Sequence, residues 1–229
     1  MAEDSPDYLG HRARLRDRFL NGGGKSMADY ELLELLLTYA IPRRDVKPIA
    51  KDIVRKFGSL AGAAKASVPQ LVEVNGVKEN TAVLLKVIQE AARRFSWAEL
   101  SATDAPVISN WDAMIDYCRT EMSHLDIEEF RIIFLDVKFR VIGEEVMQRG
   151  TINQVAIHPR EVLKMAMEKK ASALILVHNH PSGDVKPSRA DVEITKQIKQ
   201  ALEAINILLL DHIIISKYDY ASLKSLQVI

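Results

Sequence analysis

The chain has 229 residues, of which 48% are hydrophobic and 27% charged, and its formal net charge is zero. This composition is typical of a soluble globular protein with one large or two small domains. The single cysteine, Cys118, excludes an intrachain disulfide framework, and one thiol cannot build a zinc ribbon or an iron–sulfur cluster. Any metal site must therefore use His, Asp or Glu.

The expected compartment is the cytoplasm. Residues 1–10 are acidic and polar, unlike a secretory signal, and no apolar run approaches the ~20 residues that span a bilayer. A chain without disulfides also suits a reducing environment. We expect no membrane partner, and the sequence predicts no particular oligomeric state.

The first hundred residues have the apolar spacing of helices. Gly58 follows one of these patterns at the position of a C-terminal cap. The segment 96–106 combines Ser, Thr, Asp and Pro, which predicts a linker. The sequence thus predicts a helical domain over 1–100 and a second domain over 106–229. The helices are expected over 7–20, 28–40, 45–57, 60–65, 68–74 and 80–97.

The second half alternates strand-like and helix-like segments, which predicts an α/β domain with a mixed sheet. Ser109 is the expected N-cap of its first helix. Cys118 is expected in a helix core, and His158 with Pro159 is expected at a helix start. Helices are predicted over 110–122, 160–168 and 189–205, and strands over 130–135, 141–148, 173–177 and 207–216.

A metal site is predicted where the strand over 173–177 ends. His178 and His180 are separated by one residue, and in an extended chain such positions point to the same side. Ser188 is the expected N-cap of the next helix, with Asp191 in its first turn. We expect His178, His180 and Asp191 to surround one point. Two nitrogens and a carboxylate suit zinc, and three protein ligands leave a position for water, as in catalytic sites.

Each part of this pattern has an ordinary structural alternative. An isolated His-x-His pair is a weak signal, and Ser188 with Asp191 is also what a capped helix start requires. Their combination directly after an apolar strand is far more specific. Pro181 follows the histidines, unlike the HxHxDH of metallo-β-lactamase-like enzymes, and the chain has only six histidines. The count favours one metal ion per chain.

The segment HNHPSGDVKPSRAD resembles the JAMM (MPN+) metalloprotease signature in the form carried by the bacterial RadC family. The resemblance extends over GTINQVAIHPREVLKMAM, ALILVHNHPSGD and LLLDHIII, and the helical half is similar to that family's N-terminal domain. It implies a JAMM/MPN-like mixed sheet with flanking helices, of the cytidine-deaminase-like kind, preceded by a small all-α domain. It also implies a zinc metallopeptidase acting on an unidentified protein or peptide.

The resemblance implies a glutamate general base on an earlier strand. Glu128 and Glu129 have opposite strand phases, so only one can face the zinc. The family pattern places the base eight residues before the aspartate that ends the strand, here Asp136, which selects Glu128. Zinc would lower the pKa of a bound water toward ~7. Glu128 would then move its proton, and Ser188 would donate to the oxyanion during hydrolysis of a peptide or isopeptide bond.

Two further residues near the predicted site have open roles. Asp184 is expected to organise the loop after the histidines. His212 is expected either to orient a metal ligand or simply to be a hydrogen-bonded histidine in the sheet.

The helical half carries a second hypothesis. Residues 71–82 resemble one helix-hairpin-helix, a motif whose glycine turn exposes backbone N–H groups to DNA phosphates, but Lys78 replaces the second glycine. The arginines between Arg12 and Arg18 would add phosphate contacts, or they form a solvated helix face. The alternative function is therefore a DNA-associated, repair-type binding protein whose zinc site is structural or vestigial.

Overall fold

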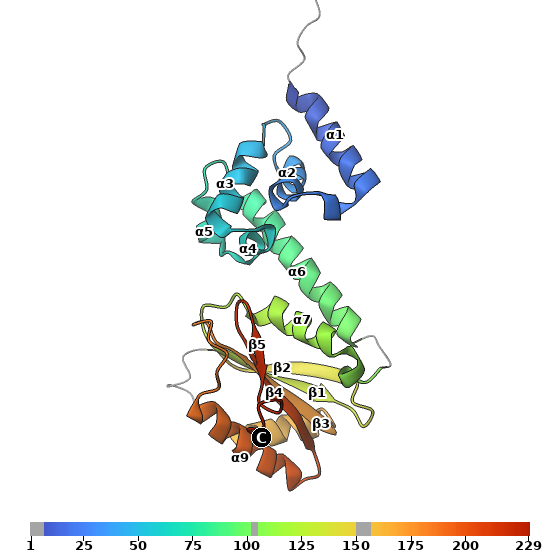
Figure 1. Ribbon diagram of the computed structural model, residues 1–229, viewed down its shortest axis with the longest axis vertical. Helices are drawn as coiled ribbons and strands as arrows, with labels where there is room; N and C mark the ends of the chain where they lie inside the picture. The colour runs from blue at the N-terminus through green and yellow to red at the C-terminus, as the bar shows by residue number, and fades with distance from the viewer. Residues whose placement is uncertain (1–6, 102–104, 150–156) are drawn as a thin grey trace, which may run out of the picture. The chain divides into compact units, whose positions relative to one another are not determined.

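The computed structural model describes residues 7–101, 105–149 and 157–229. The chain divides into two compact units, Met1–Ala91 and Ala92–Ile229, called here the N-terminal and C-terminal units (Figure 1).

The N-terminal unit is built from helices, as predicted. Gly58 ends one of them with φ +82°, which confirms its expected capping role because glycine adopts this conformation without steric cost. Leu33, Ile53 and Leu71 are fully buried in its core. The elements are α1 (Asp7–Gly22), η1 (Gly24–Ser26), α2 (Asp29–Ala40), α3 (Lys47–Phe57), α4 (Leu60–Lys65), α5 (Val68–Val72) and α6 (Glu79–Ser101).

The prediction of a linker over 96–106 is wrong in its first part, because α6 continues to Ser101. Leu100 is 2% exposed and belongs to the core of the C-terminal unit, and Trp97 packs against that core. Burial of these two side chains holds in a helix a stretch whose Ser content indicates a loop. The two units divide within α6, at Ala91 and Ala92.

The C-terminal unit confirms the predicted α/β class. Its five-stranded mixed sheet has the order β2-β1-β3-β4-β5, in which β3 and β4 are parallel and the other pairs antiparallel. The strands are β1 (Glu129–Leu135), β2 (Val141–Arg149), β3 (Ala173–Asn179), β4 (Leu208–Ile215) and β5 (Tyr220–Ser222). The short β5 was not predicted.

The helices of this unit are η2 (Val107–Asn110), α7 (Trp111–Met122), α8 (Pro159–Glu168) and α9 (Arg189–Glu203). His158 is the N-cap of α8 and Cys118 is buried in α7, as predicted. The expected N-cap Ser109 is wrong: it lies inside η2, and Asn110 precedes α7 without a side-chain cap.

Alternation along the strands separates two faces of the sheet. Ile133 and Val177 point into a core shared with α7, whereas Ile132 and Leu176 point into a core shared with α8 and α9. Figure 1 shows α7 and α9 on opposite sides of the strands. We call these sides the α7 face and the α9 face.

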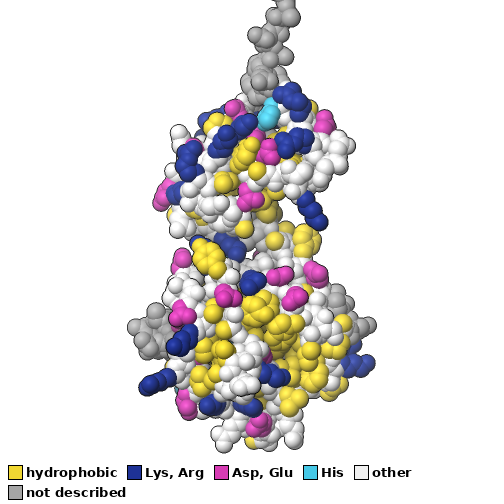
Figure 2. Space-filling view, viewed as in Figure 1, with side chains coloured by type: hydrophobic (Ala, Val, Ile, Leu, Met, Phe, Trp, Pro, Cys, Tyr) yellow, Lys and Arg dark blue, Asp and Glu magenta, His cyan; other side chains and the backbone are white. Residues whose placement is uncertain are grey.

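The surface carries charges of both signs. Figure 2 shows Lys and Arg side chains interspersed with Asp and Glu on the side of the N-terminal unit in view. Among the helices of the described segments, none is long and apolar enough to cross a membrane.

Candidate metal centre

The two histidines lie at the end of β3, in the middle of the sheet. His178 is the last but one residue of the strand, and the backbone N–H of His180 donates to the Ile215 carbonyl at 2.8 Å, which continues the pairing with β4. The chain therefore stays extended through both residues. As expected from their spacing, the two rings point to the same side, with their Nε2 atoms 2.9 Å apart.

Asp191 is placed by the start of α9. Ser188 is the N-cap, as predicted: its Oγ accepts from the Asp191 N–H at 3.1 Å, and Asp191 Oδ2 accepts from the Ser188 N–H at 2.7 Å. This reciprocal capping box fixes both the backbone and the carboxylate of Asp191. The carboxylate is therefore held in one orientation by local structure.

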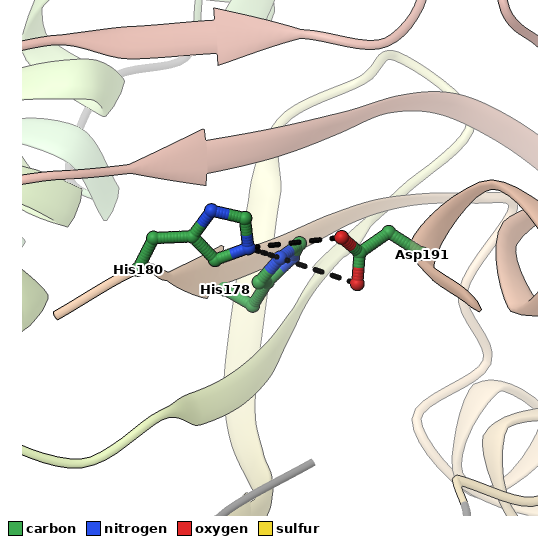
Figure 3. Close-up of side chains that lie close together, drawn as sticks. All are labelled: His178, His180 and Asp191. Atoms are coloured by element: carbon green, nitrogen blue, oxygen red, sulfur yellow. Dashed lines mark hydrogen bonds and ion pairs between the residues drawn. The ribbon is translucent and has the colours of Figure 1, made fainter. Parts of the chain in front are cut away.

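These elements bring together the three predicted ligands (Figure 3). Asp191 Oδ1 lies 3.6 Å from His178 Nε2, and Asp191 Oδ2 lies 3.6 Å from His180 Nε2. One ligand atom from each residue lies within 4.8 Å of the other two, a spacing at which the group could hold a metal ion. His178 and Asp191 are buried, whereas 11% of the His180 side chain is exposed. The group is thus open to solvent on the His180 side.

The donor chemistry fits a cation. His180 Nδ1 lies 2.6 Å from the backbone carbonyl of Asp184, and because a carbonyl only accepts, the ring proton of neutral His180 is on Nδ1. Its Nε2 lone pair then faces His178 Nε2 and the Asp191 carboxylate. Electron pairs of two imidazoles and a carboxylate repel at this spacing unless a positive charge lies between them.

The pKa values of two of the three candidate ligands, His178 and Asp191, agree with a metal-binding arrangement. Burial lowers the pKa of His178 to about 4, against an opposing effect of Asp191, and burial also places the pKa of His212 well below its ordinary value. Burial raises the pKa of Asp191, but the hydrogen bond with His180 and the charge of His178 outweigh it and bring the pKa below its usual range. Hydrogen bonding to Asp191 raises the pKa of His180. At neutral pH His178 is therefore neutral and Asp191 ionised, the states that bind metals.

Glu128 and Glu129 have different surroundings. Glu128 comes directly before β1 and is half-buried, and its charge raises the pKa of His180, so it belongs to the surroundings of the histidines. The ring of Phe130, two residues on, stacks on His178 with centroids 6.1 Å apart. Glu129 is 2% exposed and forms an ion pair with Arg131 on the α7 face. Of the two carboxylates, Glu128 is the one whose charge acts on a histidine of the candidate site.

Arg131 is the centre of a largely buried group that we call the arginine cluster: Arg131, Glu129, Glu121, Glu144 and Tyr117. Arg131 Nη1 lies 2.8 Å from Glu121 Oε2 and 3.2 Å from Glu144 Oε2. The Tyr117 hydroxyl donates to Glu144 at 2.5 Å. Through its ion pair with Arg131, Glu129 belongs to an ionic network on the α7 face and not to the histidine group.

Asn179 connects the histidines to the segment that carries Glu128. It lies between His178 and His180 and is 1% exposed. Its Oδ1 accepts from the Glu129 N–H at 2.7 Å, and its Nδ2 donates to the Ile127 carbonyl at 3.0 Å. Asn179 thus holds the backbone on both sides of Glu128. Sequence reasoning missed this role, although strand alternation already turns residue 179 away from its two neighbours.

Three outer residues have roles that the sequence left open or missed. Asp184 organises its loop, as expected, by accepting from the Lys186 N–H at 2.9 Å. His212 is fully buried, with Nε2 2.7 Å from His178 Nδ1, so it is a hydrogen-bonded sheet histidine that also contacts a candidate ligand. Thr195 lies 2.6 Å behind it and was not predicted, although it lies one helical turn after Asp191.

In the N-terminal unit, Arg12 and Arg18 of the clustered arginines contact other segments of the protein. Arg12 donates to the Ile41 carbonyl at 3.0 Å, and Arg18 donates to Glu31 at 2.8 Å. Gly76, between α5 and α6, has φ +87°, and Lys78 is exposed just before α6. The assignment of a helix-hairpin-helix stays a prediction.

Comparison with known proteins finds family matches for both halves of the chain. A family model described as RadC-like JAB domain matches residues 108–228, and another, described as UPF0758 N-terminal, matches residues 8–83. A relative from Rhodobacter capsulatus described as a UPF0758 protein is 49% identical over 203 residues, which cover 89% of this chain and 94% of the relative. The resemblance inferred from the sequence is thereby confirmed.

Proposed function

This chain belongs to the RadC-like JAB domain family, and from that premise we propose that it is a zinc-dependent hydrolase that cuts a peptide or isopeptide bond. The observation that carries the proposal is the convergence of His178, His180 and Asp191 on one point. Families with a JAB/MPN domain are generally hydrolytic, which favours chemistry over a purely structural metal site.

The ligand set supports zinc as the metal. Two imidazole nitrogens and one carboxylate oxygen are a typical catalytic zinc set, and three protein ligands leave one position for water. His178, His180 and Asp191 would hold the ion. When bound, zinc would supply a Lewis acid that lowers the pKa of water toward ~7.

Glu128 is proposed as the general base. The proposal is supported by the effect of its charge, which raises the pKa of His180, and by Asn179, which holds the backbone on both sides of Glu128. The carboxylate would take a proton from the attacking water and later give it to the leaving amine. Proton transfer of this kind typically contributes about 10²–10⁴-fold in rate.

Ser188 is proposed to stabilise the oxyanion that forms on the attacked carbonyl. Its Oγ accepts from the Asp191 N–H, which leaves the hydroxyl proton for donation to substrate. One oxyanion donor is typically worth about 10²–10³-fold in kcat. A capping function alone predicts a loss of about 1 kcal/mol in stability on Ser188→Ala, without the rate loss.

The proposal is tested by a substrate screen. Purified protein is incubated with a peptide library and with isopeptide-linked peptides, and products are identified by mass spectrometry. Glu128→Gln should keep zinc and lose about 10²–10⁴-fold in hydrolysis. The matched control is Glu129→Gln, which changes the neighbouring carboxylate on the α7 face and should retain activity. Equal hydrolysis by wild type and Glu128→Gln would contradict the proposed mechanism.

A second candidate function is DNA association through the N-terminal unit. It is supported by the turn at Gly76, where a Cβ atom would lie only 2.8 Å from the side chain of Ile49. It is also supported by Lys78, which is exposed just before α6. Backbone N–H groups at such a turn suit a phosphate. Full-length protein should then bind DNA with a salt-dependent affinity that Lys78→Glu lowers. Absence of binding at low salt would remove this candidate.

A further inference from the structure

A buried pair of polar side chains, His212 and Thr195, lies behind the ring of His178, on the side away from the candidate metal position. His212 Nε2 lies 2.7 Å from His178 Nδ1, and His212 Nδ1 lies 2.6 Å from Thr195 Oγ1. Thr195 Oγ1 is also hydrogen-bonded to the backbone carbonyl of Asp191. His212 and Thr195 are both 0% exposed. The protein thus joins two of the three candidate ligands by an internal chain of hydrogen bonds.

The direction of this chain follows from its last member. The Asp191 carbonyl can only accept, so the single hydroxyl proton of Thr195 lies on that hydrogen bond. Thr195 Oγ1 must therefore accept from His212, which places the ring proton of neutral His212 on Nδ1. His212 Nε2 is left as an acceptor. His178 Nδ1 must then donate to it.

The consequence is a defined tautomer of His178. A neutral imidazole has one ring proton, and with that proton on Nδ1 the lone pair is on Nε2. Nε2 is the atom that faces His180 and Asp191. We propose that His212 and Thr195 are positioning residues that hold His178 in the tautomer and orientation needed to bind the metal ion. This inference rests on the metal site of the proposed function.

The chain also couples the two ligands mechanically. It starts at the backbone of Asp191 in α9, passes through Thr195 one turn later, crosses to His212 in β4, and ends at His178 in β3. The rings of Phe130 and His212 are in edge contact, with an interplanar angle of 70° and centroids 5.4 Å apart. This contact restricts rotation of His212. A shift of α9 against the sheet would therefore move two candidate ligands together, Asp191 in α9 and His178 in β3.

His180 provides an internal contrast. Its Nδ1 is held by the backbone carbonyl of Asp184, in the loop after β3, and not by a side chain. Substitution of His212 or Thr195 should therefore disturb His178 and leave the tautomer of His180 unchanged. Groups that orient a metal-bound histidine are typically worth about 10–100-fold in metal affinity.

Zinc affinity of the full-length protein, measured by competition with a chromophoric chelator, tests the proposal without any substrate. His212→Leu should raise the Kd for Zn²⁺ about 10–100-fold. Thr195→Val removes the hydroxyl at nearly constant volume and should raise the Kd toward the lower end of that range, whereas Thr195→Ser should keep wild-type affinity. Unfolding midpoints of all variants show whether they remain folded. Equal affinities of folded Thr195→Val and Thr195→Ser would overturn the proposal.

A second measurement reads the tautomer directly. In ¹⁵N NMR spectra of metal-free wild-type protein, the Nδ1 of His178 should carry the proton, and Thr195→Val should move part of the population to the Nε2-protonated form. Wild-type His178 protonated on Nε2 alone would also overturn the proposal. Failure of the proposed function would give a different result: zinc-loaded protein that hydrolyses nothing, or wild-type protein that binds no zinc. In either case the NMR spectrum still shows whether His212 and Thr195 set the tautomer of His178.

Discussion

The two faces of the sheet each bury a group of charged and polar side chains. On the α7 face, one guanidinium is surrounded by three carboxylates, and Tyr117 donates to one of them. On the α9 face, two imidazole nitrogens and a carboxylate direct electron pairs at one point. The arginine cluster already contains its own cation, whereas the histidine group could hold a metal ion as its cation.

We propose that this difference distinguishes a structural cluster from a metal-binding one, although both carry carboxylates and both are largely buried. A buried ion pair with its partners present mainly fixes the fold, and it loses stability when one partner is removed. A buried set of converging donors without an internal cation is organised for a ligand.

Removal of the guanidinium from the arginine cluster should have the largest effect. Arg131→Met removes the guanidinium that Glu129, Glu121 and Glu144 all contact, and leaves Glu121 only the more distant Arg93, at 3.9 Å. The free energy of unfolding should therefore fall by about 3–5 kcal/mol. Urea denaturation measures this change. Arg131→Lys, which keeps a positive charge, should lose less. The zinc content of folded Arg131→Met should stay at the wild-type value, and its loss would show that the two faces are not separate in function.

Acidification should destabilise the metal-free protein through the α9 face. The pKa of His178 falls from its ordinary 6.5 to about 4 on folding, and that of His212 also falls, so the unfolded chain binds more protons between these pH values. Stability should therefore decrease as the pH falls from 6.5 to 4, by about 3 kcal/mol for His178 alone. His180 opposes this change, because its raised pKa favours the folded state at low pH.

Urea denaturation of chelator-treated protein at pH 7 and pH 5 measures this balance. The lowered pKa values of two buried histidines should outweigh the raised pKa of one partly exposed histidine. We therefore expect lower stability at pH 5 than at pH 7. Greater stability at pH 5 would contradict the assignment of neutral His178 and His212.

Substitution of Asn179 should lower the stability by a smaller amount. It should also change activity, because Asn179 contacts the backbone on both sides of Glu128. Asn179→Ala leaves the Glu129 N–H and the Ile127 carbonyl without their partner, at a cost of about 1–3 kcal/mol in stability. Since the backbone around Glu128 loses its support, hydrolysis should fall by up to about 10²-fold while zinc is retained. The double variant Asn179→Ala, Glu128→Gln should lose no more activity than Glu128→Gln alone. Additive losses would mean that Asn179 acts independently of Glu128.

Local signals in the sequence account for much of the fold. Helical spacing predicted the helices of the N-terminal unit, and Gly58 predicted one helix end. At the candidate site, the period of two along a strand placed His178 and His180 on one side, and the N-cap pattern placed Asp191 at a helix start. Each of these inferences depends on residues within one turn or one strand.

The features that were missed depend on contacts between distant segments. Ser101 is helical because neighbouring Leu100 is buried against the sheet, which no local composition reveals. The β5 strand has three residues and is defined by its pairing with β4. The hydrogen-bond chain from Thr195 to His212 joins α9 to β4, so it requires the packing of a helix on a strand.

The central claim is that the convergent histidines and aspartate bind a metal ion. Metal analysis of purified full-length protein by mass spectrometry tests it most directly, with His178→Ala as the variant and His158→Ala, at the start of α8, as the matched histidine control. We predict about one zinc per chain in wild type and in His158→Ala, as expected for a set of three protein ligands, and none in His178→Ala. Wild-type protein that takes up no zinc, or His178→Ala that binds it as wild type does, would contradict the account.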